Sequence, residues 1–351
     1  MSLKRTMSVF LLLCAAATGL AAQPAFVELP ADTIPTDVSA DGTQVVGWFE
    51  ERETFLWNAG EGFRNLGGGC PLVQFPVAGR PAISADGTRI FGCTYVDRRS
   101  HIGRWLGGAE WEVVSDEPAY LLDVDALGSV VVGQQVGTFQ ASAWDLQSGE
   151  QQLFPGNGLS RVNAVSADGS VLVGYETPPG GRVGLVWQDG QAVELVSGGV
   201  RLGAGRAVND DGTVVFGRGW DLRAEEGGGF AWRWFEAEGF ARLGLTGHDK
   251  KDGGFFALET IPQDTDSAGK TMVGYVGFMR GSTDLRVAYY AVVWTEEFGF
   301  ERVAAPLNRA GVRVPDGWEL VEATAISDDG STIVGWGTFD GESRGWLIRL
   351  W

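Results

Sequence analysis

Short runs of alternating apolar and polar residues recur along the chain, separated by tight turns rich in glycine. Residues 165–174, Val-Ser-Ala-Asp-Gly-Ser-Val-Leu-Val-Gly, are one of seven such copies. Glycine accepts a positive φ and aspartate bonds its own backbone, so Asp168-Gly169 between two β-rich runs predicts a hairpin turn. The pattern then predicts a third strand at 184–187 and a fourth at 192–196.

Four short antiparallel strands per copy, repeated roughly every 40 residues, are typical of a β-propeller blade. Helical solenoids would need a 3.6-residue apolar rhythm that the chain lacks, and a parallel β-helix repeats on a shorter period. We therefore expect an all-β, seven-bladed β-propeller with four-stranded antiparallel blades. The seven hairpin turns are expected at 41–42, 86–87, 125–128, 168–169, 211–212, 267–269 and 329–330.

The two ends of the repeat array complete one another. The apolar run 26–29 looks like a fourth strand with no blade before it, and the last repeat stops after its third strand at 345–350. Pairing these two strands would complete the seventh blade and remove exposed sheet edges. The sequence thus predicts a ring closed by its own N-terminal strand.

One tryptophan recurs in each predicted third strand, and we expect all seven to share one position. A carbohydrate-stacking role is the alternative, but a residue repeated in every blade usually packs between neighbouring sheets. These residues are Trp57, Trp105, Trp144, Trp187, Trp232, Trp294 and Trp346.

The first 22 residues differ in character from the rest. Lys4 and Arg5 precede an apolar core at 7–17 and the small residues 19–22, the pattern of a cleaved secretory signal; a retained anchor is the alternative. We expect residues 23–351 to form one propeller domain that is periplasmic or extracellular. The 53 glycines suit a chain with many turns between short strands.

A net charge of −18 argues against nucleic acid and anionic membranes as partners. Plain solubility explains this charge, and hydration at high salt or attraction of Ca²⁺ are also compatible with it. We expect no cofactor, because each Asp-Gly turn alone supplies too few oxygens for Ca²⁺. We expect a monomer without stable membrane insertion.

Few residues are available for covalent or metal chemistry. Cys70 and Cys93 are the two cysteines after the signal, and we predict a disulfide between them. With His101 and His248 as the only histidines, a multi-histidine metal centre is excluded. No nucleophile elbow, P-loop or dinucleotide fingerprint is present.

The longest connections are expected on one face, opposite the Asp-Gly turns. They span 67–82, 218–229, 246–264, 276–289 and 305–325, and long loops on a rigid scaffold commonly carry binding sites. Carboxylates and arginines in them could serve acid/base chemistry or hold a uronate or sialate, although for any one of them a solvated loop charge is the favoured interpretation. The candidates are Trp220, Asp221, Arg223, Glu225, Glu226, His248, Asp249, Lys250, Asp252, Arg280, Asp284 and Arg286.

The repeated Val/Ile-Ser-x-Asp-Gly-x-x-Val-Val-Gly followed by Phe-Leu-Trp resembles the HAF-type extracellular repeat of secreted bacterial proteins. The run 317–330, which includes Gly317-Trp318-Glu319-Leu320, is similar to the last repeat of such proteins. The resemblance spans roughly residues 30–350 and implies architecture and export, without an activity.

Two functions fit these observations. The first is a secreted, non-catalytic propeller that binds a protein or glycan through its long-loop face. The alternative is a carbohydrate-active hydrolase or lyase that uses acidic and basic residues on the same face. A deep axial pocket with converging carboxylates and an arginine or histidine would favour the enzyme, and a shallow, dispersed face would favour binding.

Overall fold

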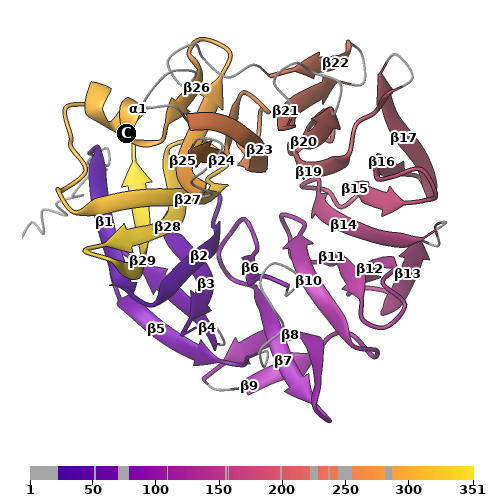
Figure 1. The fold of residues 1–351 in the computed structure, drawn as a ribbon. Coiled ribbons are helices and arrows are strands. Elements are labelled where there is room, and N and C mark those ends of the chain that lie inside the picture. Colours follow the sequence, from indigo (N-terminus) through magenta and orange to yellow (C-terminus); the bar gives the residue numbers. More distant parts are fainter. Residues whose placement is uncertain are drawn as a thin grey trace, which may run out of the picture.

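Strands form wherever the alternating pattern predicts them, and they assemble into seven antiparallel sheets around one axis in the computed structural model (Figure 1). The structure describes residues 23–50, 53–69, 79–108, 110–154, 156, 158–197, 200–221, 228–235, 238–243, 255–280 and 287–351. The fold is the predicted seven-bladed β-propeller.

The first three blades follow the chain directly. Blade 1 holds β2 (Thr33–Val38), β3 (Gln44–Phe49), β4 (Glu53–Asn58) and β5 (Gly62–Gly67). Blade 2 holds β6 (Ala82–Ile83), β7 (Ile90–Val96), β8 (Arg99–Gly107) and β9 (Glu110–Val113). Blade 3 holds β10 (Ala119–Val124), β11 (Val130–Gln135), β12 (Ala141–Asp145) and β13 (Glu150–Phe154).

The next three blades keep this order, with one addition. Blade 4 holds β14 (Leu159–Val165), β15 (Val171–Thr177), β16 (Val183–Gln188) and β17 (Gln191–Ser197), and a short fifth strand, β18 (Val200–Arg201), that was not predicted. Blade 5 holds β19 (Ala204–Val208), β20 (Val214–Asp221), β21 (Gly228–Phe235) and β22 (Gly239–Arg242). Blade 6 holds β23 (Phe255–Thr265), β24 (Thr271–Arg280), β25 (Val287–Thr295) and β26 (Gly299–Arg302).

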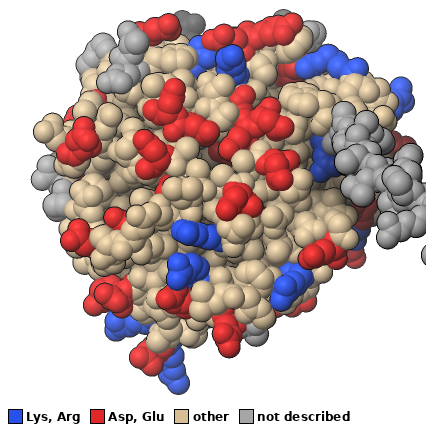
Figure 2. Space-filling model, turned by 180° about the vertical axis from the view of Figure 1, so that it is seen from behind, with Lys and Arg blue, Asp and Glu red and all other residues tan. Residues whose placement is uncertain are grey.

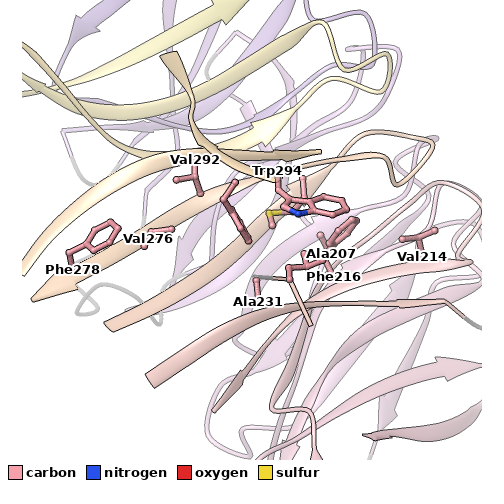
Figure 3. Close-up of a cluster of buried hydrophobic side chains, with 11 residues drawn as sticks. Ala207, Val214, Phe216, Ala231, Val276, Phe278, Val292 and Trp294 are labelled. Atoms are coloured by element: carbon pink, nitrogen blue, oxygen red, sulfur yellow. The ribbon is translucent and has the colours of Figure 1, made fainter. Parts of the chain in front are cut away.

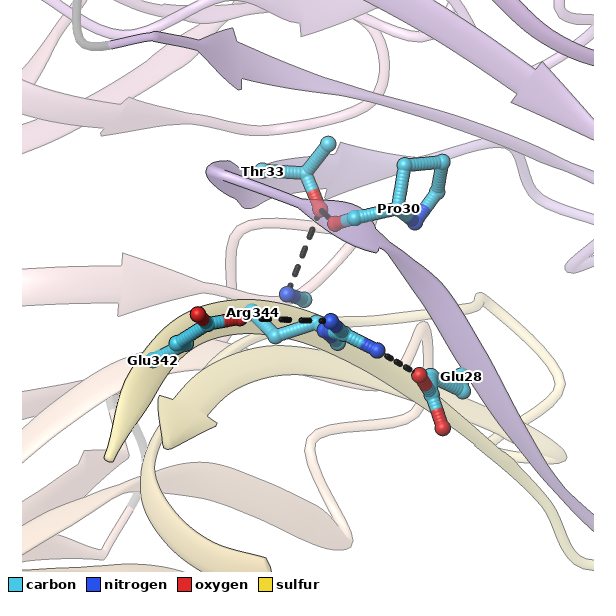
Figure 4. A network of polar contacts seen from close by, with 6 residues as sticks. Glu28, Pro30, Thr33, Glu342 and Arg344 are labelled. Atoms are coloured by element: carbon cyan, nitrogen blue, oxygen red, sulfur yellow. Dashed lines mark hydrogen bonds and ion pairs between the residues drawn. The ribbon is translucent and has the colours of Figure 1, made fainter. Parts of the chain in front are cut away.

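The seventh blade joins the two ends of the chain, as predicted. Helix α1 (Ala304–Arg309) leads to β27 (Trp318–Ile326), β28 (Thr332–Phe339) and β29 (Glu342–Arg349), and β1 (Ala25–Ala31) adds the fourth strand. Phe26 lies opposite Ile348, and Figure 4 shows Arg344 of β29 reaching Glu28 of β1. Thr33 holds the next turn of the chain, since its hydroxyl donates to the Pro30 carbonyl at 2.6 Å.

The Asp-Gly turns share one hydrogen-bond pattern. In blade 4 the Ser166 hydroxyl donates to the Asp168 carboxylate at 2.8 Å and accepts the Val171 amide at 3.0 Å. Blade 3 lacks the serine, and Asp125 itself accepts the Val130 amide at 2.8 Å. The turn thus keeps its shape where the repeat sequence departs from the pattern.

A chain of backbone hydrogen bonds links these turns from blade to blade around the axis. The Ala40 amide donates to the Ala85 carbonyl at 3.0 Å, the Ala85 amide to Ala126 at 2.9 Å, and the Ala126 amide to Ala167 at 3.1 Å. The same type of bond continues through Asp210, Ser267 and Asp328. The first strands of successive blades also contact one another, so they line the axis.

The apolar core is divided into clusters between neighbouring blades. One cluster, shown in Figure 3, packs Phe216 of blade 5 against Trp294 of blade 6. Each recurring tryptophan contributes to a different cluster, which confirms that they pack between sheets. Dividing the core in this way makes each blade depend on its neighbours for burial.

The tryptophans do not all share one position, and this prediction was wrong for two of them. Trp187 lies opposite Leu172, whereas Trp232 and Trp346 lie opposite the second-strand glycines Gly217 and Gly335, two residues further along. A Cβ on Gly217 would lie 2.1 Å from the Trp232 ring, so the glycine makes room for the indole. Because the strand repeat is two residues, the shifted rings still face the same side.

Several segments predicted as loops are strand extensions. Residues 255–264 belong to β23, residues 276–280 to β24 and residues 287–289 to β25. Irregularities in pairing at Ala257/Glu259 and at Pro262/Asp264 obscure the two-residue alternation in β23. These longer strands raise the rim of blade 6 on the side away from the turns.

Candidate functional site

The predicted loop site lies almost entirely outside the described residues. Trp220 and Asp221 are the last residues of β20, and Arg280 is the last residue of β24; their side chains are not described. The remaining candidates lie outside the described part of the chain: Arg223, Glu225, Glu226, His248, Asp249, Lys250, Asp252, Asp284 and Arg286. That site therefore stays a prediction.

A cavity of about 570 Å³ lies on the axis, within the size range of ligand pockets. Its walls come from first-strand residues such as Ile34 and Arg161 and from second-strand residues such as Trp48 and Tyr275. These residues are set back along their strands from the Asp-Gly turns, so the cavity lies toward the long-loop face. The polar lining residues are Thr36, Arg80, Asn163, Arg161, Arg206, Arg218, Glu259, Gln263, Tyr275, Tyr289, Glu322, Thr324, Trp48 and Trp336.

Two of the four arginines have partners in the wall. The Arg80 Nε donates to the Leu122 carbonyl of the next blade at 2.8 Å. Arg218 forms an ion pair with Glu259 of blade 6, with 2.5 Å between nitrogen and oxygen. These contacts fix the two side chains and balance the charge of Arg218.

Arg161 of β14 and Arg206 of β19 are different, because neither forms an ion pair within the described residues. The Arg161 Nε is enclosed without a hydrogen-bond partner. Burial, opposed in part by Tyr175, lowers the pKa of Arg161 to about 10, and burial also lowers the pKa of Arg206. Arginine side chains stay protonated in proteins, so both guanidinium groups are charged and enclosed, with part of their surface open to the cavity.

Tyr275 lies among these charges. Burial, followed by the neighbouring carboxylates of Glu322 and Glu259, raises the pKa of Tyr275, so its hydroxyl stays protonated. The hydroxyl donates no hydrogen bond to the described protein atoms and remains available to a ligand. The Tyr289 ring meets the Tyr275 ring edge-on, with centroids 5.7 Å apart.

Glu322 of β27 is held from two sides. It accepts a hydrogen bond from Gln263 Nε2 at 2.5 Å and from Trp336 Nε1 at 3.1 Å. Burial raises the pKa of Glu322, opposed by Trp336 and by the charge of Arg206. The cavity thus combines arginine, tyrosine and glutamate side chains in a defined arrangement.

Along the axis toward the Asp-Gly turns, the wide cavity is followed by a small cavity of about 30 Å³, which has room for about one water. Asp37, Asp123 and Asp264 lie at this level, each directly after a residue that lines the wide cavity. The ring of linked turns lies beyond them. The wide cavity is therefore a dead end with acidic groups at its closed end.

The outer surface contrasts with the cavity. Figure 2 shows Asp and Glu spread over the side opposite to Figure 1, with fewer Lys and Arg among them. The whole chain carries 27 Lys and Arg against 45 Asp and Glu. Four arginines on the wall of one cavity are therefore a local concentration of positive charge in an acidic protein.

The sequence analysis missed this cavity. Arg161 and Arg206 stand in strands whose other residues are mostly buried, within a few residues of an Asp-Gly turn. A charged residue in a strand predicted to lie against the axis is the signal that was available.

Other predicted chemistry can be placed in part. His101 is buried in β8, with Nδ1 2.9 Å from the Ser115 carbonyl oxygen, and has a structural role. Within the described ranges, no group of three or more His, Cys, Asp or Glu could hold a metal ion. No helix among the described residues is long and apolar enough to cross a membrane.

The disulfide prediction stays open, because Cys70 lies outside the described residues. Cys93 is buried in β7, and the amide of Gly69, the neighbour of Cys70, donates to the Cys93 carbonyl at 2.9 Å. The backbone geometry therefore brings the two cysteines' segments together.

The chain matches no protein-family model and no curated protein sequence. It is similar in fold to oligogalacturonate lyase from Vibrio parahaemolyticus, with a TM-score of 0.57 and 11% identity over 93% of this chain and 97% of that one. Hydrazine synthase from Kuenenia stuttgartiensis gives a TM-score of 0.54 and 16% identity over 95% and 98%. A putative TolB from Agrobacterium tumefaciens gives 0.42 and 14% over 93% and 90%. At these identities the likeness extends to the propeller fold alone.

Proposed function

We propose that the protein is an exported, non-catalytic propeller of the extracellular-repeat type, which binds an anionic ligand in its axial cavity. The ligand enters from the long-loop face, where the surrounding loops contact the rest of a glycan or protein partner. Residues 1–22 direct the export and are then removed, which leaves the mature protein in the periplasm or outside the cell.

The observation that carries this proposal is the pair Arg161 and Arg206. Burying a guanidinium group without an ion pair costs free energy, and a buried charged group in a cleft is a candidate for a functional site. Tyr275 adds a hydroxyl donor beside them. These donors face open space in a cavity of ligand size.

A second candidate, a carbohydrate-active hydrolase or lyase, is favoured by one feature of the same cavity. Glu259 and Glu322 converge there with the arginines, which is the arrangement expected of the enzyme. One protein of similar fold is named oligogalacturonate lyase, but at 11% identity that likeness concerns the fold only. The enzyme hypothesis therefore rests on the two carboxylates.

The test is a thermal-shift screen of the mature protein against simple mono- and dicarboxylates, inorganic phosphate and a glycan library, with turnover assayed in parallel. We expect at least one anion to stabilise the protein and R206Q to abolish this effect. R64Q is the matched control, because Arg64 lies over the Trp105 ring, away from the cavity, and its loss changes the net charge equally. If no anion depends on Arg206, the proposal is wrong, and turnover of a glycan would favour the enzyme.

A further inference from the structure

We infer that the axial cavity recognises the terminal unit of an acidic saccharide, with the uronate carboxylate held by Arg161, Arg206 and Tyr275. This inference rests on the proposed function and adds the chemical class of the ligand and the part of it that enters. Three features of the cavity support it: the balance of charges, the side chains of the lining and the closed end.

The charge balance selects a singly charged group. Arg218 is neutralised by Glu259, and Arg80 has Asp123 and Asp264 within electrostatic range below it. The carboxylate of Glu322 lies near Arg206. The positive charge that remains around Arg161 and Arg206 is small, so a carboxylate fits it better than a doubly charged phosphate, which Glu322 would also repel.

The donor groups suit a carboxylate as well. A carboxylate has two oxygens that accept several hydrogen bonds, and guanidinium groups bind it with two parallel bonds. The Tyr275 hydroxyl supplies a further donor because it stays protonated at neutral pH. The two guanidinium groups can only donate, and the Tyr275 hydroxyl has one O–H to donate.

The rest of the lining suits a sugar ring. Trp48, Trp336 and Tyr289 contribute aromatic surface, and the Tyr289 side chain is 41% exposed. The Asn163 Nδ2 donates to the Gly205 carbonyl at 2.6 Å, which leaves its Oδ1 for a ligand hydroxyl. A pyranose presents apolar C–H faces and equatorial hydroxyls, and therefore uses both kinds of surface.

The closed end determines which part of a saccharide binds. At Asp37, Asp123 and Asp264 the open space on the axis shrinks to a cavity of about 30 Å³, so a saccharide chain cannot pass through it. These carboxyl groups also make the narrow end unfavourable for an anion. An acidic saccharide must therefore enter end-on from the long-loop face and present a terminal unit to the arginines.

The experiment is titration calorimetry with galacturonate, glucuronate and mannuronate trisaccharides, each beside its methyl ester and its neutral counterpart. We expect at least one uronate trisaccharide to bind, and its ester to bind about 10- to 100-fold more weakly, the effect of losing charge-assisted hydrogen bonds. R206Q and Y275F should weaken uronate binding, R206Q more strongly, and R64Q should leave it unchanged. With longer uronate chains, the number of bound proteins should follow the number of chain ends.

Two results would overturn the inference. The first is equal affinity for a uronate trisaccharide and for its methyl ester. The second is that no uronate trisaccharide has a higher affinity than a simple monocarboxylate or a sugar phosphate. If simple carboxylates still bind in an Arg206-dependent manner, the proposed function stands and only the ligand class is wrong. If correctly folded R206Q and R206K bind every anion as tightly as the unchanged protein, both the inference and the proposed function are wrong.

Discussion

The carboxylate of Asp264 in blade 6 accepts a hydrogen bond from the backbone amide of Ile326 in blade 7, at 2.9 Å. Asp37 binds the Ile83 amide at 2.8 Å, and Asp123 binds the Val165 amide at 3.0 Å, in the same way. Three buried carboxyl groups thus join the first strands of neighbouring blades beside the axis. Burial raises the pKa of Asp264 to about 7 and that of Asp123 to about 6, and it raises the pKa of Asp37 well above its usual value.

The raised pKa values of these three carboxyl groups predict that mild acid stabilises the protein. Their pKa values in the unfolded chain are about 3.9, so the folded state binds more protons between about pH 4 and pH 7. Stability should therefore fall as the pH rises from 5 to 8, as measured by urea unfolding. Below about pH 4 the trend should reverse, because hydrogen bonds lower the pKa of the turn residue Asp86 and of its equivalents.

Asp264→Asn tests the source of this effect. The two carboxylate oxygens accept the Thr265 and Ile326 amides, whereas asparagine has one acceptor oxygen and would place an NH₂ group against an amide. We expect a loss of about 1–3 kcal/mol and a flatter pH dependence between 5 and 8. Asp189→Asn, at an exposed turn, is the control; an unchanged pH profile in D264N would contradict the assignment.

The turn glycines should be sensitive where a neighbouring blade meets them. Gly212 has φ +76°, and a Cβ there would lie 2.5 Å from Val171 Cγ2 of blade 4. Gly239 has φ +81° with nothing within 4 Å of its Cβ position. We expect Gly239→Ala to cost about 1–2 kcal/mol for its backbone alone, and Gly212→Ala about 1–3 kcal/mol more. Equal melting temperatures for the two variants would show that the contact between blades is unimportant.

Closure by the N-terminal strand should make that strand essential for stability. Leu29 of β1 is 1% exposed and packs in the cluster that contains Leu347. Leu29→Ala should cost about 2–5 kcal/mol in guanidinium unfolding, because it leaves a cavity at the junction of the ring. Leu153 of β13 is 41% exposed, so Leu153→Ala should have little effect.

Arg206 should reduce stability in the absence of a ligand. Arg206 forms no ion pair within the described residues, and replacing it by a neutral side chain removes its desolvation cost at the loss of its longer-range attraction to Glu322; R206Q should therefore stabilise the unliganded protein by about 1 kcal/mol. Arg218→Gln should do the opposite, because it leaves Glu259 without its ion-pair partner. Both changes are measured as shifts in melting temperature, and destabilisation by R206Q would indicate a structural role.

The predicted bridge between Cys70 and Cys93 should stabilise the protein. Closing a loop of this size stabilises a protein by about 3 kcal/mol in the chain-entropy model. We expect intact mass after alkylation to show no free thiols in the mature protein, and a reductant to lower its melting temperature. Cys93→Ser should give the lower value with or without reductant.

Much of the fold could be predicted because the turns are specified by local sequence and the blades can be counted from the repeats. An Asp-Gly pair such as Asp168-Gly169 specifies its turn through its own hydrogen bonds. Seven hairpin turns, five of them with such a pair, and one unmatched strand at each end imply closure. The exact register was less predictable. Trp232 and Trp346 shift by two residues because Gly217 and Gly335 leave room for their rings, and that fit depends on another strand.

The cavity could not be predicted from any one segment. Arg161, Arg206, Tyr275 and Glu322 come from four different blades and are separated by tens of residues in the chain. Sequence alone determined the blade, the number of blades and the strand that closes the ring, because each depends on turn chemistry and alternation. Only the tertiary structure decided which side chains meet on the axis and which charges lack a partner, because burial and electrostatic balance are properties of all seven blades together.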